Sequence, residues 1–191
     1  MSKFPIILAS QSPRRRQLLA NAGYDFITIP PGESAESGVY SGELPDKMVM
    51  RLAWQKAFDV VMRVERGIVL GCDTVAECCG RILGKPSDVE HAREMLQLLQ
   101  GNEHRVLSGV CLWEVETSRH AVEVAVTQLV MEPLIDNRIE DYLASGQWQG
   151  KAGAFGYQDG HDWLRVLEGS ESNVVGLPLE LLREMLERMF N

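Results

Sequence analysis

Residues 8–19 read LASQSPRRRQLL and predict a buried strand that turns into a helix. Ser12 is a good N-cap, and Pro13 suits the first helical position. An apolar face follows, and Gly23 ends the helix. The arginines at positions 14–16 lie in the first turn, where a helix already carries partial positive charge. Helix formation alone therefore does not explain this run of cations.

A ligand would explain the run. A strand, a serine-containing turn and a helix N-terminus together form an anion site, because backbone N–H groups and the helix dipole point at the ligand. Arginine adds paired donors that suit phosphate. A bound phosphate would reverse the penalty of cations in the first turn. The alternative is that all three arginines are solvated surface groups.

Strands and helices continue through the rest of the chain without strict alternation. Expected strands cover residues 4–9, 24–29, 68–70, 106–115, 121–130 and 163–167, with a hairpin at 75–83. Expected helices cover residues 13–22, 46–63, 135–144, 177–190 and a segment from Ser87, capped by Ser87 and Glu90, to the glycine at 101. Adjacent strand pairs imply antiparallel segments, so we expect an α/β fold with a mixed sheet and helices on its faces.

Composition limits the classes of function. The 191 residues suit one domain or two small lobes that share a core, and the net charge of -8 argues against a general nucleic-acid-binding surface. None of the four cysteines forms a CxxC pair, which favours free thiols in a reducing cytosol over a zinc site. We find no signal peptide and no membrane-length apolar segment, and we expect a cytoplasmic protein.

Two residues stand out near the middle of the chain. Lys56 lies on the apolar stripe of the expected helix at 46–63, so it must snorkel, pair or face a cleft. Asp73 follows the expected strand at 68–70 within GCDTV. A carboxylate at a strand end can hold a divalent metal or orient water, although aspartate there is also an ordinary turn residue.

Three loops add further candidates. Lys85 in LGKP supplies a point charge, and Gln158 in KAGAFGYQDG can read the edge of a base through its amide. Glu33 or Glu36 could complete a magnesium site with Asp73. Each is otherwise an ordinary exposed loop residue. The chain has no GxSxG, Walker A or GxGxxG motif, which argues against serine hydrolases, P-loop NTPases and Rossmann folds.

Six short motifs together resemble a known family. In chain order they are LASQSPRRRQLL, RLAWQKA, GCDTV, LGKP, KAGAFGYQ and VVGLPLELL. They are similar to the signatures of the Maf family of nucleoside triphosphate pyrophosphatases, and the match runs nearly from end to end. Each piece is weak alone, but six in the right order are highly specific.

The resemblance implies a single Maf-like domain over residues 1–191, with a twisted mixed sheet and two lobes around a cleft, similar to inosine triphosphatases. It implies hydrolysis of a nucleoside triphosphate between the α- and β-phosphates, with Mg²⁺ or Mn²⁺, giving a nucleoside monophosphate and pyrophosphate. It implies no nucleic-acid polymer or membrane as partner, and a homodimer by analogy. Because Maf-like proteins are also linked to inhibition of cell division, a non-enzymatic nucleotide-binding regulator is the competing reading.

The resemblance also assigns roles to residues. Asp73 matches the catalytic acidic residue, expected to act as a base or as a metal-linked activator of water, and Lys56 and Lys85 match the lysines of the cleft. The phosphate-binding opening matches Ser10, Ser12, Arg14 and Arg15. Arg16 matches no required position, so we expect it to be exposed to solvent.

Three positions indicate a branch of the family. Arginine after Ser-Pro, threonine after the aspartate and glutamine in the glycine-rich loop mark the dTTP/UTP pyrophosphatases, and Arg14, Thr74 and Gln158 fit. The branch acting on 7-methyl-GTP usually has tryptophan and glutamine at the first two positions. The metal-linked glutamate is Glu36 or Glu33, since the loop PPGESAES is one residue longer than the family pattern; counting favours Glu36 slightly.

Overall fold

The computed structural model describes residues 5–36, 40, 42–134, 136–160 and 162–190. Within these ranges seven strands form one sheet in the order β2-β1-β3-β5-β6-β7, with β4 paired to β3. The strands are β1 (Ile6–Ala9), β2 (Phe26–Thr28), β3 (Ile68–Cys78), β4 (Arg81–Leu83), β5 (Glu103–Glu114), β6 (His120–Met131) and β7 (Leu164–Glu168). β1 is parallel to β2 and β3, whereas β3–β4 and β6–β7 are antiparallel. The predicted mixed sheet is confirmed.

Helices accompany this sheet, as predicted for an α/β fold. They are α1 (Pro13–Asn21), α2 (Pro45–Val61), α3 (Val89–Leu99), α4 (Asp136–Ala144), α5 (Glu171–Val175) and α6 (Leu179–Phe190). Short 3₁₀ helices are η1 (Glu33–Glu36), η2 (Ala152–Ala154) and η3 (Tyr157–Asp159). In the described ranges, none of the helices has the length and apolar character that crossing a membrane requires.

The chain divides into two compact units. The first comprises Met1–Asp73, Ser108–Ala125 and Gly176–Asn191, and the second comprises Thr74–Leu107 and Val126–Val175. This division agrees with the two lobes that the resemblance to the Maf family implies. The single domain over residues 1–191 and the cleft between lobes stay predictions.

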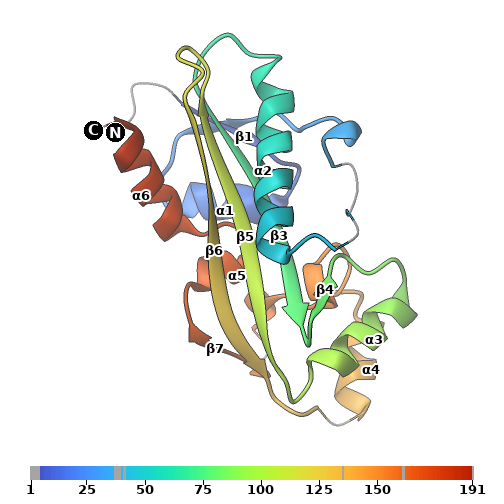
Figure 1. Cartoon of the computed structure of the whole chain (residues 1–191). Coiled ribbons are helices and arrows are strands. Elements are labelled where there is room, and N and C mark those ends of the chain that lie inside the picture. The colour runs from blue at the N-terminus through green and yellow to red at the C-terminus, as the bar shows by residue number, and fades with distance from the viewer. Residues whose placement is uncertain (1–4, 37–39, 41, 135, 161, 191) are drawn as a thin grey trace. The chain divides into compact units, whose positions relative to one another are not determined.

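Alternation along the strands builds the core of the first unit. Ile6 and Leu8 of β1 pack with α1 and α6, whereas Ile7 and Ala9 pack with α2. This is the two-residue period of a strand buried on both faces. Within this unit, Figure 1 shows α2 on one side of β1 and β3, with α1 and α6 on the other.

Two glycines allow α2 to lie directly on the strands. A Cβ added at Gly71 of β3 would lie 2.1 Å from the carbonyl oxygen of Ala53, and one at Gly109 of β5 would lie 2.1 Å from that of Val49. Real side chains never approach a backbone atom so closely. The absence of a side chain at both positions therefore sets the height of α2 above the sheet.

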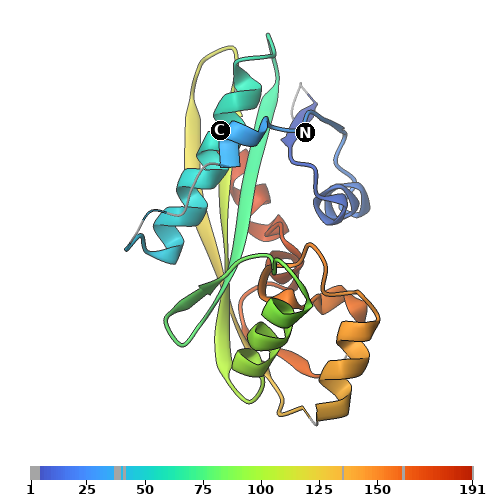
Figure 2. The same cartoon turned by 90° about the vertical axis from the view of Figure 1, so that its right-hand side faces the viewer.

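The second unit has its own apolar core. Leu96 and Leu99 of α3 and Ile139 and Leu143 of α4 are buried in one cluster with residues of β3 to β6. Figure 2 shows α3 and α4 side by side within this unit.

Two expectations about local structure are wrong, and one short helix is not predicted. The strand expected to end at Gly71 continues to Cys78, because that glycine serves the approach of α2 and not a turn. The cap of α3 is Asp88, not Ser87: the Asp88 carboxylate accepts a hydrogen bond of 2.8 Å from the N–H of His91. The sequence pattern does not predict α5, because its single turn has no apolar period.

Candidate active site

The alternation of β3 directs Asp73 toward α2. Val69 belongs to the apolar layer under α2 and Gly71 touches α2, so Asp73, two residues further on, faces the same side. Lys56 lies on α2 one turn after Ala53, which contacts Gly71. The Nζ of Lys56 donates a hydrogen bond of 2.6 Å to Oδ1 of Asp73. Close packing of one helix on one strand therefore joins the two residues.

Both partners of this ion pair are withdrawn from solvent. The side chain of Lys56 is 7% exposed and that of Asp73 is 15% exposed. The sequence allowed Lys56 to snorkel, to pair or to face a cleft, and in the structure it pairs with Asp73. A buried ammonium group is costly without a counter-charge, so Asp73 stabilises Lys56 and Lys56 in turn fixes the orientation of the carboxylate.

The first turn of α1 forms a second cluster of polar groups. Ser12 caps the helix by accepting a hydrogen bond of 3.4 Å from the N–H of Arg15, which confirms the predicted cap. The Oγ of Ser10 accepts hydrogen bonds from Nη1 of Arg15 (3.1 Å) and from the N–H of Ser12 (3.2 Å). Ser10 follows β1 directly, so the strand end and the helix start are held together at this oxygen.

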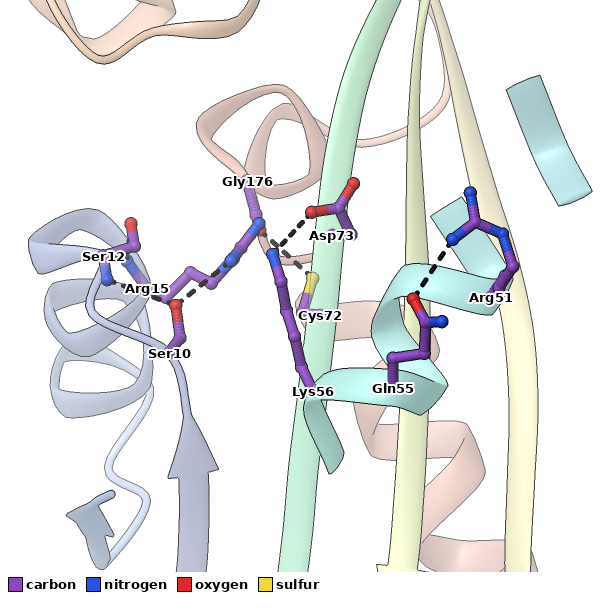
Figure 3. Close-up of polar contacts among 9 residues, drawn as sticks. All are labelled: Ser10, Ser12, Arg15, Arg51, Gln55, Lys56, Cys72, Asp73 and Gly176. Carbon is purple, nitrogen blue, oxygen red and sulfur yellow. Dashed lines mark hydrogen bonds and ion pairs between the residues drawn. The ribbon is translucent and has the colours of Figure 1, made fainter. Parts of the chain in front are cut away.

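Arg15 links this cluster to the ion pair. Its Nε donates a hydrogen bond of 2.8 Å to the carbonyl oxygen of Gly176, which also accepts one of 3.4 Å from Sγ of Cys72. Cys72 immediately precedes Asp73. Figure 3 shows Arg15, Gly176, Cys72 and Asp73 together with Lys56. The predicted opening residues Ser10, Ser12 and Arg15 are thus linked, through Gly176 and Cys72, to Asp73 and its partner Lys56, a pairing that the sequence did not specify.

The three arginines differ in their surroundings. Arg15 is buried, Arg14 is half-buried and Arg16 is exposed. The expected exposure of Arg16 is confirmed. The guanidinium group of Arg15 donates hydrogen bonds to Gly176 and Ser10 of the protein itself, a structural role that the sequence did not predict.

Three predicted residues belong to the second unit. Thr74 is half-buried in β3, and Lys85 and Gln158 are exposed. The loops of the latter two are tied together, because the N–H of Gly153 donates a hydrogen bond of 3.0 Å to the carbonyl oxygen of Gly84. Lys85 and Gln158 therefore lie on two loops whose backbones are in contact.

The donor set for a metal ion is sparse. No group of three or more His, Cys, Asp or Glu residues that could hold a metal is found among the described residues. Glu33 is exposed at the start of η1, while the side chain of Glu36 lies outside the described part of the chain. Mg²⁺ usually keeps several waters and binds through one or two carboxylates together with substrate phosphates. Asp73 fits that need for a carboxylate.

Comparison with known proteins decides the family. The family model described as Maf-like protein matches residues 5–189. The chain belongs to the Maf family.

Relatives of this Maf protein share one name. A dTTP/UTP pyrophosphatase of Rhodopirellula baltica is 55% identical over 183 residues, covering 95% of this chain and 81% of the relative. Another from Ruminiclostridium cellulolyticum is 39% identical over 185 residues, covering 96% and 95%. A HAM1 protein structure from Coxiella burnetii has a TM-score of 0.50 at 15% identity, covering 97% of this chain and 99% of that one. This last likeness concerns the fold alone.

Sequence reasoning missed Arg51, which lies on α2 within the RLAWQKA motif. Its Nε and Nη2 donate hydrogen bonds of 2.8 and 2.6 Å to the two carboxylate oxygens of Glu43, and Nη1 donates one of 3.1 Å to Gln55. The guanidinium lies 4.2 Å from the centre of the Tyr40 ring. These bonds hold the pKa of the Glu43 carboxyl below its ordinary value. Arg51 thus holds Glu43, two residues before α2, and its place in the motif is the signal that the sequence offers.

Proposed function

We propose that this Maf protein hydrolyses dTTP and UTP to the nucleoside monophosphate and pyrophosphate, with Mg²⁺ or Mn²⁺ as cofactor. The observation that carries the proposal is the buried Lys56–Asp73 pair, connected through Cys72 and Gly176 to Arg15. The name shared by relatives that cover 95% or more of the chain supports this substrate class. Arg14, Thr74 and Gln158 fit the dTTP/UTP branch.

Asp73 is the group that would activate water. Lys56 holds Oδ1, which leaves Oδ2 as the oxygen to take a proton from water attacking the α-phosphorus. The bond from that phosphorus to the bridging oxygen then breaks, and pyrophosphate leaves. A divalent cation held by Asp73 and Glu36 or Glu33 would supply charge neutralisation on the phosphates and a lower pKa for water.

Cationic groups would neutralise the negative charge of the substrate. A nucleoside triphosphate carries close to four negative charges, whereas the chain carries a net charge of -8. Binding therefore depends on local cations, namely Arg14, Arg15 and the N-terminus of α1, with Lys85 as a further point charge. In this proposal Gln158 contacts the base.

A nucleotide panel tests the proposal. The full chain is incubated with dTTP, UTP, CTP, GTP or 7-methyl-GTP and with Mg²⁺ or Mn²⁺, and pyrophosphate and orthophosphate are measured separately. We expect pyrophosphate and monophosphate, fastest from dTTP and UTP. Asp73→Asn should lose most of this turnover, and the exposed Arg16→Ala serves as a matched control with near wild-type turnover.

Other results of the nucleotide panel would each contradict one part of the proposed function. Orthophosphate without pyrophosphate contradicts the bond assignment, and near wild-type activity in Asp73→Asn contradicts the role of Asp73. A preference for 7-methyl-GTP contradicts the branch assignment. Nucleotide binding without turnover would support a regulator in place of an enzyme.

A further inference from the structure

A buried ion pair closes the glycine-rich loop of the second unit. The Nζ of Lys151 donates a hydrogen bond to Oδ2 of Asp159, and the two side chains are only 10% and 12% exposed. The hydroxyl of Tyr142 donates a further bond of 3.3 Å to the same oxygen. The two ends of the loop are therefore joined below its surface.

The residue between them leaves space for this pair. A Cβ added at Gly156 would lie 2.5 Å from Nζ of Lys151 and 2.6 Å from Oδ2 of Asp159. The carbonyl oxygen of Gly156 accepts a hydrogen bond of 3.1 Å from the N–H of Asp159, which closes η3. A side chain at position 156 would therefore force the ends of the Lys151 and Asp159 side chains to move from these positions.

Gln158 is the exposed residue between two anchored neighbours. Asp159 on one side belongs to the ion pair. Tyr157 on the other side donates a hydrogen bond of 2.7 Å from its hydroxyl to Oε1 of Glu171. Gln158 itself is exposed. The backbone that carries its amide is thus fixed at both flanking residues.

Aromatic rings support the loop from inside the unit. Tyr142, Phe155 and Trp163 lie with their ring centres 5.4 to 5.5 Å from one another. Rings at this spacing attract each other beyond the burial of their area. Tyr142 thus belongs to this aromatic group and also donates a hydrogen bond to the carboxylate of the ion pair.

A buried ion pair is weak evidence for stability, because well-packed apolar residues of similar volume are often at least as stabilising. Its benefit is a defined geometry. A group that must meet a ligand needs support from residues whose own positions are locked by packing and hydrogen bonds. The side-chain amide of Gln158, next to Asp159, is exposed and is the group that would contact the base in the proposed function.

We propose that Lys151 and Asp159 are positioning residues, which hold Gln158 in the orientation that selects the base of the nucleotide. This inference rests on the proposed function. Neither residue touches the reacting phosphates, and both act through Gln158. Loss of the pair should therefore weaken base selection and leave the chemical step intact.

Steady-state kinetics on the full chain test this inference. Wild type, Asp159→Asn, Gln158→Ala and the double variant are assayed for pyrophosphate release from dTTP, UTP and CTP. We expect Asp159→Asn to raise KM for dTTP about tenfold, the effect of about one lost charged hydrogen bond, with kcat within about twofold. The preference for dTTP over CTP should fall with it. The double variant should be no worse than Gln158→Ala alone.

Two further variants serve as a control and as a substitute in case Asp159→Asn does not fold. Asp162→Asn removes a carboxylate whose side chain is 83% exposed, and it should behave as wild type. Should Asp159→Asn not fold, Lys151→Met combined with Asp159→Leu removes both charges together and avoids an isolated buried ammonium. This combination should fold and show the same rise in KM and the same loss of base preference.

The failures are distinguishable. A wild-type chain without turnover of any triphosphate overturns the proposed function and this inference with it. An active wild type with additive effects of Asp159→Asn and Gln158→Ala overturns the inference alone. An unchanged KM, or a fall in kcat at constant KM and base preference, does the same.

Discussion

The first turn of α1 contains three arginines whose positions in the sequence look equivalent. Arg15 donates to the carbonyl oxygen of Gly176 and to Oγ of Ser10, whereas Arg16 is exposed. Arg15→Ala should lower the free energy of unfolding by about 2–4 kcal/mol, because the hydrogen bonds from a charged donor to Gly176 and Ser10 are lost at a buried site. Arg16→Ala should change it by less than about 0.5 kcal/mol. Urea unfolding measures both, and equal effects would contradict this distinction.

The Lys56–Asp73 pair gives a second prediction at the residue scale. Asp73→Asn should lose turnover and also about 3 kcal/mol of stability, because it leaves the buried ammonium of Lys56 without that carboxylate. Lys56→Met combined with Asp73→Asn should recover much of the stability but none of the turnover. Thermal unfolding and pyrophosphate release are measured side by side. If stability falls further in the double variant, the ion pair is not the source of the loss.

The apolar stripe of α2 restricted Lys56 to three environments but could not choose among them. Its partner Asp73 lies 17 residues later in β3, and the face of the sheet to which Asp73 points depends on the alternation of that strand. A break at Gly71 was expected there, which hid the continuity of that strand. Contacts within one element were thus predictable, whereas those between elements depended on packing distances.

At the scale of elements, the approach of α2 to β3 controls the geometry of the Lys56–Asp73 pair. Gly71→Ala places a Cβ against the backbone carbonyl of Ala53, which cannot rotate away as a side chain can. We expect a loss of about 3 kcal/mol or more, as in severe overpacking, and reduced turnover because Lys56 moves away from Asp73. Gly84→Ala is the stability control, since an added Cβ there has nothing within 4 Å. Equal melting temperatures for both variants would show that α2 does not depend on Gly71.

The stability that the Arg51–Glu43 pair contributes should depend on pH. Hydrogen bonds from Arg51 lower the pKa of Glu43 in the folded state, so this contribution to stability is full above the ordinary pKa of 4.5 and is lost as the pH falls through the folded-state value. Glu43→Gln should lower the melting temperature by about 2 °C at pH 7, an effect of the size of one partly buried hydrogen-bonded pair, and by less at pH 3. Calorimetry at both pH values measures this. Glu65→Gln at an exposed position is the control, and a difference that grows toward pH 3 would contradict the argument.

For the whole molecule, local patterns were sufficient for the class of fold but not for its topology. The helix at Pro13, the long α2 and the hairpin at residues 75–83 follow from capping, periodicity and turn residues. The position of β3 between β1 and β5 does not, because strand order is set by which faces pack and not by local sequence. The same holds for the link from Arg15 to Gly176, which joins residues 161 positions apart.

Charge at the scale of the whole molecule gives the last prediction. A chain with a net charge of -8 must bind a substrate with close to four negative charges, so neutralisation has to be local. If a divalent cation coordinates the phosphates beside Asp73, removing it with EDTA should lower dTTP turnover by about a hundredfold or more. Mg²⁺ or Mn²⁺ should restore it, whereas NaCl at the same ionic strength should not, because screening cannot replace coordination. Turnover that survives EDTA, or that NaCl restores, would mean that the arginines and lysines alone stabilise the leaving pyrophosphate.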